Sequence, residues 1–412
     1  MRKASIVSIG NEVLSGQTID TNASYLSGEL LGAGIPVVSS YTIGDDIESI
    51  ARTFRLAAGD ADMILATGGL GPTDDDVTRQ ALAKFLGAGL VFEDALFRKI
   101  EDYFERRNLR MSSRNRVQAY IPAGATALAN TAGTAPGIMA EGGGKLIVAL
   151  PGVPAEMRRM FEESVVGKLK ELAGEQAVVV RKVRCFGTGE SNIAELVGPL
   201  MERGRNPLIN STASHGVITL HIISTANNRG QAEAMAKEDE RLLRQKLGEV
   251  VYGSGEQTLA AVVGEELSRQ NKTISVAESC TGGWLAKLLT DVPGASGYFM
   301  QGWVTYSDAA KTGELGVAAK LLERHGSVSG EVALAMGEGA RKTAVTDYAI
   351  GITGIAGPSG GSEQKPVGLV YISVVWAEGS ETKRFVFSGD REAIRRRAAH
   401  TGLNMLRLNM KV

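Results

Sequence analysis

The chain has 412 residues, enough for two or three domains that each bury a hydrophobic core. Its 45 basic and 46 acidic side chains nearly cancel, which excludes a strong field for binding nucleic acid or an anionic membrane. Two distant cysteines, Cys185 and Cys280, and the lack of an apolar run near ~20 residues argue against a disulfide framework, a cysteine-based zinc site and a membrane span. We expect a protein of the reducing cytoplasm.

The first part of the chain alternates short β-branched runs with longer amphipathic ones. This rhythm predicts an α/β fold in which helices cover a parallel sheet, with ligands at the carboxyl ends of the strands. The predicted strands are 5–9, 36–40, 63–66 and 146–150, and the predicted helices are 22–31, 47–58 and 77–85.

Two further units are expected after residue 172. Residues 173–252 form a small α/β module, and residues 252–257 form a linker to a second complete α/β unit over 256–412. In the module we predict strands at 177–186 and 217–224 and helices at 190–203 and 231–247. The last unit opens with a helix at 259–270, a strand at 273–277 and a glycine loop.

That loop offers a candidate nucleophile. Ser279 falls just past the predicted strand end and is followed by Thr281, Gly282 and Gly283 before a helix. A serine at this edge can be presented to a ligand, and backbone N–H groups at the start of the helix can stabilise the oxyanion of an acyl transfer. The alternative is that Ser279 or Thr281 only caps the helix.

A serine nucleophile needs a base, and this half of the chain has only His325 and His400, neither in a glycine-rich loop. Lys311 can act instead if burial lowers its pKa, and Tyr306, five residues earlier, can relay the proton or hold the lysine. The alternative for Lys311 is a solvated surface lysine.

Two more residue types suit a nucleotide phosphate. Thr353 lies where another predicted strand ends. It is a candidate for a phosphate or ribose contact, and the alternative is a structural turn. Asp390 is a predicted N-cap, and it is followed on one helix face by Arg391 and Arg395. An arginine at a helix start can bind a phosphate.

Four separated motifs of this half resemble the C-terminal domain of CinA-type proteins. They are AESCTGGWLAKLLTDVPGAS, VTYSDAAKTGELGV, ITGIAGPSGGSEQKPVG and FSGDR. The resemblance implies a nicotinamide-nucleotide amidohydrolase, which converts nicotinamide mononucleotide to nicotinate mononucleotide and ammonia without a cofactor. It implies that Ser279 is the nucleophile, that Tyr306 and Lys311 activate it, and that Thr353 and Arg391 bind the nucleotide.

In the N-terminal part, four loops rich in glycine or proline follow predicted strands: IGNEVLSG, GGLGPTDDD, GTAPG and PGVPAE. None is a P-loop or a complete dinucleotide fingerprint. At one sheet edge they should converge on a pocket, and the backbone of 67–73 can wrap a phosphate. The candidate binding residues are Gly68, Gly69, Gly71, Thr73, Gly133 and Thr134.

Asp74, Asp75 and Asp76 follow directly. We expect at least one of them to hold Mg²⁺ or a similar divalent metal against a pyrophosphate, with Glu12 and Asp20 as further acidic candidates. Capping of the helix that begins at residue 77 is the alternative.

GNEVLSG, DTN, GGLGPTDDD, NTAGTAPG and PGVPAEM resemble the CinA-type branch of the molybdopterin-binding superfamily, a three-layer α/β domain. That branch implies metal-dependent hydrolysis of ADP-ribose to AMP and ribose 5-phosphate. Residues 176–252 resemble the KH-like insert of the same family, but their GTGE turn poorly matches a nucleic-acid clamp.

The leading hypothesis is thus a bifunctional pyridine-nucleotide hydrolase and homodimer, with no membrane or direct nucleic-acid partner. Two alternatives remain: a molybdopterin-binding protein, and a non-enzymatic regulator related to competence.

Overall fold

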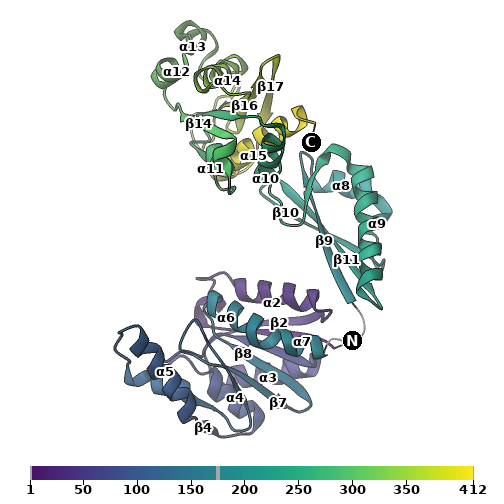
Figure 1. Cartoon of the computed structure of the whole chain (residues 1–412), viewed down its shortest axis with the longest axis vertical. Helices are drawn as coiled ribbons and strands as arrows, with labels where there is room; N and C mark the ends of the chain where they lie inside the picture. The colour runs from purple at the N-terminus through teal and green to yellow at the C-terminus, as the bar shows by residue number, and fades with distance from the viewer. Residues whose placement is uncertain (1, 173–176, 412) are drawn as a thin grey trace. The chain divides into compact units, whose positions relative to one another are not determined.

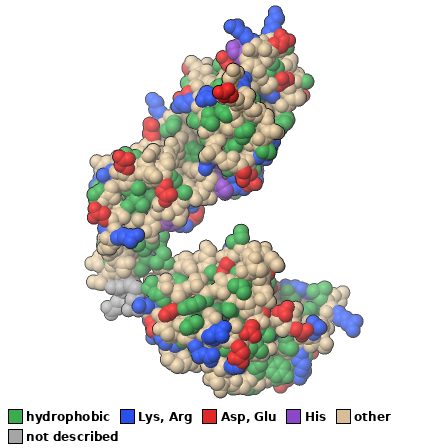
Figure 2. Space-filling view, turned by 180° about the vertical axis from the view of Figure 1, so that it is seen from behind, with side chains coloured by type: hydrophobic (Ala, Val, Ile, Leu, Met, Phe, Trp, Pro, Cys, Tyr) green, Lys and Arg blue, Asp and Glu red, His purple; other side chains and the backbone are tan. Residues whose placement is uncertain are grey.

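The computed structural model describes residues 2–172 and 177–411. Contacts divide the chain into two compact units (Figure 1): Met1–Val179 with Ser224–Ala234, and Val180–Ile223 with Met235–Val412. On the face drawn in Figure 2, acidic and basic side chains are interspersed, as their near-equal numbers suggest. No helix of the described ranges is long and apolar enough to cross a membrane.

The first unit is built on a six-stranded sheet with the order β2-β1-β3-β8-β7-β6. The first four strands run parallel, and β7 and β6 add antiparallel to them. The predicted parallel strands are confirmed, but the two antiparallel strands were not expected. The bounds are β1 Ala4–Ile9, β2 Val37–Ile43, β3 Met63–Thr67, β6 Thr126–Leu128, β7 Gly137–Gly142 and β8 Lys145–Leu150.

Helices cover both faces of this sheet because its buried strands are apolar on each side. One core joins the sheet to α2 (Thr21–Gly32), α6 (Pro154–Met160) and α7 (Val166–Leu172). The other joins it to α3 (Ile47–Asp60) and α4 (Thr78–Leu86), so the predicted three-layer arrangement is confirmed. Further elements complete the unit: α1 Asn11–Leu14, β4 Leu90–Phe92, α5 Asp94–Arg106 and β5 Tyr120–Pro122.

The middle module contains a four-stranded sheet with the order β10-β11-β9-β12. The expected linker at 252–257 was placed too early, because Tyr252 is buried in β12 and this strand pairs antiparallel with β9. β10 was not expected, since its exposed polar residues break the apolar alternation. The bounds are β9 Ala177–Phe186, α8 Glu190–Val197, β10 Leu208–Ser214, β11 Val217–Ala226, α9 Arg229–Leu247 and β12 Val251–Ser254.

The C-terminal sheet has the order β14-β13-β15-β16-β17. β14, β13 and β15 are parallel, and β16 and β17 run antiparallel beyond them. The bounds are β13 Ile274–Glu278, β14 Phe299–Val304, β15 Tyr348–Gly354, β16 Leu369–Trp376 and β17 Gly379–Val386.

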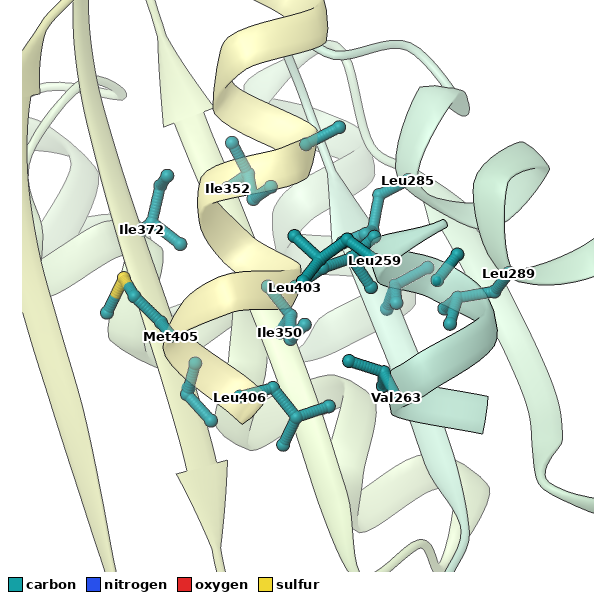
Figure 3. Packing of buried hydrophobic residues seen from close by; sticks show 14 of the residues in the cluster. Leu259, Val263, Leu285, Leu289, Ile350, Ile352, Ile372, Leu403, Met405 and Leu406 are labelled. Carbon is teal, nitrogen blue, oxygen red and sulfur yellow. The ribbon is translucent and has the colours of Figure 1, made fainter. Parts of the chain in front are cut away.

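Helices again lie on both faces of this sheet. α15 (Arg391–Asn409) crosses one face with α10 (Leu259–Gln270) and α11 (Trp284–Thr290), and Figure 3 shows Leu403 of α15 among side chains of α10, α11 and the sheet. The opposite core involves α12 (Asp308–Leu315), α13 (Ala319–His325) and α14 (Gly330–Ala344). The mixed α/β fold class is therefore confirmed throughout.

Candidate active sites

The C-terminal site forms where three parallel strands end side by side. In the β13 register Glu278 lies opposite Val304 of β14 and Ile352 of β15. The pairing continues one residue further, because the Ser279 N–H donates to the carbonyl of Ile352 at 3.0 Å. The residues that follow these strands therefore meet at one edge of the sheet.

The side chain of Ser279 is not used to cap α11. That task belongs to the fully buried carboxylate of Glu278, which accepts hydrogen bonds from the N–H groups of Leu285 at 3.0 Å and Ala286 at 2.8 Å. Across residues 2–172 and 177–411, the Ser279 hydroxyl has no hydrogen-bond partner. The capping alternative for Ser279 or Thr281 is thus wrong, and the serine is free to react.

Glu278 was missed in the sequence, although a signal exists. An acid inside an otherwise apolar strand must find donors when it is buried. Glu278 occupies two N–H groups at the start of α11, so these groups cannot be the oxyanion donors that we expected from the sequence. Gly282 donates its N–H to the carbonyl of Ser279 at 3.1 Å, so the loop N–H groups of Cys280, Thr281 and Gly283 are the ones without an acceptor in the described chain.

Gly282 is required by the geometry of this turn. Its φ is +59°, and a Cβ there would lie 2.8 Å from Nη2 of Arg395. Arg395 in turn donates to the carbonyl of Thr281 at 2.7 and 3.2 Å. The start of α15 therefore holds the loop that carries Ser279.

Lys311 is not a solvated surface lysine, because its side chain is 1% exposed. It lies in the first turn of α12, and its Nζ donates to the backbone carbonyl of Tyr306 at 3.2 Å. Burial lowers the pKa of Lys311, whereas the carboxylate of Asp308, 3.7 Å from Nζ, raises it. The ammonium also lies within electrostatic reach of Cys280, the neighbour of Ser279.

Cys280 is the other nucleophile type in this loop. Burial raises the pKa of its thiol to about 12, so the thiol stays protonated near neutral pH and is a weak nucleophile.

Tyr306 holds the lysine through its backbone carbonyl, not its phenol. The phenol is 61% exposed, and its oxygen accepts a hydrogen bond from Nη2 of Arg391 at 3.1 Å. The expected relay through the phenol to Lys311 is therefore not the arrangement in the structure.

Arg391 and Arg395 lie on the same face of α15, as predicted, and the carboxylate of Asp390 caps the helix through the Ala393 N–H at 2.8 Å. Arg391 also donates to the carbonyl of Gly357 at 2.7 Å. Its guanidinium thus stands at the rim of the site, between the loop after β15 and Tyr306.

Thr353 is buried at the end of β15, where its hydroxyl donates to the carbonyl of Ser327 at 2.7 Å. Its only hydroxyl proton is used by this bond, so Thr353 can offer a nucleotide an acceptor but no donor. Its clearest task is to hold the loop before α14 against the strand end.

The N-terminal site is a pocket of about 720 Å³ beyond the ends of β1, β3 and β8. Gly68 turns sharply there with a φ of +104°, and a Cβ would meet the carbonyl of Ile9 at 2.0 Å. Of the predicted binding residues, Gly133 lines an adjacent cavity of about 370 Å³ that shares Thr134 with this pocket. The others line the pocket itself: Gly68, Gly69, Gly71, Thr73 and Thr134.

The three aspartates do not act together. The side chain of Asp74 is 91% exposed, and its Oδ2 lies 3.7 Å from Nη2 of Arg114. Asp74 does not line the pocket. Asp76 accepts the N–H groups of Gly71 and Thr73, each at 2.8 Å, and so fastens the loop; it does not cap α4. Only Asp75 lines the pocket without such a task.

Three other acids line the pocket: Glu12, Asp45 and Glu156. Burial raises the pKa of Asp45, and the nearby charges of Glu12, Asp75 and Asp76 raise it further. Asp45 was missed in the sequence, where GDD after a predicted strand was the available signal. Among the described residues, no three His, Cys, Asp or Glu side chains come together as a metal site, and the expectation that at least one of the three aspartates binds a divalent metal stays a prediction.

Known proteins match the chain along its length. Residues 256–410 match the CinA C-terminal domain, 5–171 the probable molybdopterin binding domain, and 180–253 the damage-inducible protein CinA KH domain. A putative competence-damage inducible protein of Caldicellulosiruptor bescii is 41% identical over 98% of both chains. A CinA-like protein of Kosmotoga olearia is 42% identical over 98% of both chains. A solved competence/damage inducible protein from Agrobacterium tumefaciens is 36% identical, covers 37% of this chain and 94% of its own, and has a TM-score of 0.37.

Proposed function

This chain belongs to the CinA family, and on that premise we propose that its C-terminal domain deamidates nicotinamide mononucleotide to nicotinate mononucleotide and ammonia. One observation carries the proposal: a serine hydroxyl that has no partner among the described residues stands at a strand end next to the loop held by a buried lysine. A lysine whose pKa is lowered by burial is suited to act as a base.

The reaction follows from these groups. Neutral Lys311 takes the proton of Ser279 as Oγ attacks the carboxamide carbon. The loop N–H groups of Thr281 and Gly283 stabilise the oxyanion. The C–N bond then breaks, and the Lys311 ammonium returns its proton to the leaving nitrogen, which departs as ammonia. Lys311 next accepts a proton from water, which cleaves the acyl-enzyme ester and regenerates Ser279.

Arg391 supports the choice of a nucleotide over a free amide. Its guanidinium lies at the rim of the site, at the N-terminus of α15, where both its own charge and the helix dipole favour a phosphate. The exposed phenol of Tyr306 beside it can cover the pyridine ring.

Ammonia release by wild type and Ser279→Ala tests this proposal, with Ser380→Ala as an exposed serine control. We expect the loss of the nucleophile to lower turnover by about 10⁴-fold or more, while the control and EDTA leave it unchanged. Equal turnover by wild type and Ser279→Ala would remove Ser279 from the mechanism. No release from wild type would exclude the deamidase.

We further propose that the N-terminal domain hydrolyses ADP-ribose to AMP and ribose 5-phosphate. Glycine-rich loops around an acidic pocket of about 720 Å³ support this assignment. Mg²⁺ commonly binds through one or two carboxylates and the substrate's phosphates, so Asp75 and Glu12 would suffice to hold it and it would neutralise charge on the pyrophosphate.

Neighbouring aspartates supply a matched test. Asp75→Asn should abolish EDTA-sensitive hydrolysis of ADP-ribose, whereas Asp74→Asn should keep it, because Asp74 faces Arg114 outside the pocket. Equal activity of the two variants would exclude Asp75 as a ligand. Bound pterin in the purified protein, with no ADP-ribose hydrolysis, would favour a molybdopterin-binding function.

A further inference from the structure

One cavity in the second compact unit takes no part in either proposed reaction. It has a volume of about 440 Å³ and lies between the end of β17, the turn after β9 and the outer half of α15. A volume of this size is typical of small-molecule sites. None of the residues around Ser279 lines it.

Its floor is made of polar side chains that the protein itself does not satisfy. Asn404 is 8% exposed, and its Oδ1 accepts a hydrogen bond from Nε of Arg407 at 3.0 Å. That bond leaves the amide nitrogen as a donor, for which the described residues provide no acceptor. Thr401, one helical turn earlier, is 9% exposed and its hydroxyl likewise has no partner there. Neither atom is fully enclosed, so both can donate a hydrogen bond to a group bound in the cavity.

The rim of the cavity is positive. Arg397 uses Nη1 to reach the carbonyl of Ser388 at 3.0 Å, which leaves its other N–H groups available. Lys383 also lines the cavity, and its Nζ forms an ion pair with Oε1 of Glu381 at 2.7 Å. No Asp or Glu of the described chain belongs to the lining. The donors and the charge of Arg397 therefore favour a bound group that accepts hydrogen bonds and carries negative charge.

One wall is aromatic. The rings of Phe385 and Phe387 lie 5.5 Å apart with only 8° between their planes, and both line the cavity. Opposite them the turn contains Gly187, whose φ of +100° places a bare backbone beside Asn404. A flat ring can stack on such a wall, while an anion meets the donors of the floor and rim.

We propose that this cavity binds a nucleoside monophosphate. A nucleobase would stack on Phe385 or Phe387, and the phosphate would accept hydrogen bonds from Asn404, Thr401 and Arg397. The cavity holds one such molecule, and the proposal does not depend on the activity of either catalytic domain.

Photolabelling of the full chain with 8-azido-AMP, followed by peptide mapping, locates the site directly. We expect label on peptides that contain residues 381–388 or 186–189, and excess AMP should prevent it. Label on residues 1–172 gives an internal control, because AMP is also the expected product of the N-terminal domain. Label confined to residues 1–172 would overturn the proposal.

Two variants separate the contacts from the fold. Asn404→Leu keeps the side chain's size, and Arg397→Met keeps its length without the charge. Each should reduce labelling of the cavity at least tenfold and leave the N-terminal labelling unchanged. Asn404→Leu also removes the Oδ1 that accepts a hydrogen bond from Arg407, whereas Arg397→Met leaves that bond intact. Arg397→Met therefore separates the loss of a ligand contact from a folding defect. Unchanged labelling in Arg397→Met, or stronger competition by a single-stranded oligonucleotide than by AMP, would refute a mononucleotide site.

Discussion

The charge of Asp308 should set the pH at which Lys311 becomes active. Its carboxylate lies 3.7 Å from Nζ and favours the charged ammonium, which opposes the effect of burial. Since the Asp308 side chain is more than half exposed, solvent screens the pair, and water's dielectric gives an attraction of about 1 kcal/mol. Asp308→Asn removes that attraction and should lower the pKa of Lys311.

The sign follows from the role of the lysine. Only neutral Lys311 can take the serine proton, so activity rises as pH passes upward through its pKa. A lower pKa therefore moves the rising limb of kcat/KM to lower pH. Asparagine can still accept the hydrogen bond that Ser327 donates to Asp308 at 2.6 Å.

The assay is ammonia release from nicotinamide mononucleotide across pH, with Glu314→Gln as the control. Glu314 is exposed on the same helix, so its removal should leave the limb in place. An unmoved limb in Asp308→Asn, or one moved to higher pH, would show that Lys311 is not the group whose deprotonation governs the rate.

Two further predictions concern the architecture around the serine. Glu278→Gln turns one acceptor into a donor facing the N–H of Leu285 or Ala286, which should cost about 1–3 kcal/mol and lower kcat more than it raises KM; a changed KM with an intact kcat would contradict the positioning role. Leu403→Ala removes a fully buried side chain from the core under α15 and should reduce the free energy of unfolding by about 2–5 kcal/mol in a urea titration. An exposed control, Leu196→Ala, should cost much less, and equal losses would refute that account.

Much of the architecture followed from local patterns in the sequence. Helix 259–270 and strand 177–186 were predicted with the bounds observed, because apolar periodicity and β-branched runs reflect burial directly. The loop of Ser279 was recognisable for a similar reason, since a strand, two glycines and a helix in succession leave little choice of backbone. The antiparallel β6 and β7 escaped prediction because their pairing depends on partners distant in the chain.

The roles of charged residues were decided by the tertiary structure. The sequence does not distinguish Asp74, Asp75 and Asp76. In the structure Asp74 faces an arginine, Asp75 lines the pocket, and Asp76 accepts hydrogen bonds from N–H groups of its own loop. Lys311 was already a candidate base in the sequence, but the burial that this role requires is not revealed by its neighbours in the chain. The sequence by itself determined the fold class and the loops that carry chemistry, because periodicity and glycine act over a few residues. Which carboxylate is free and which lysine is desolvated depends on distance and solvent access, which exist only once the strands have been brought together.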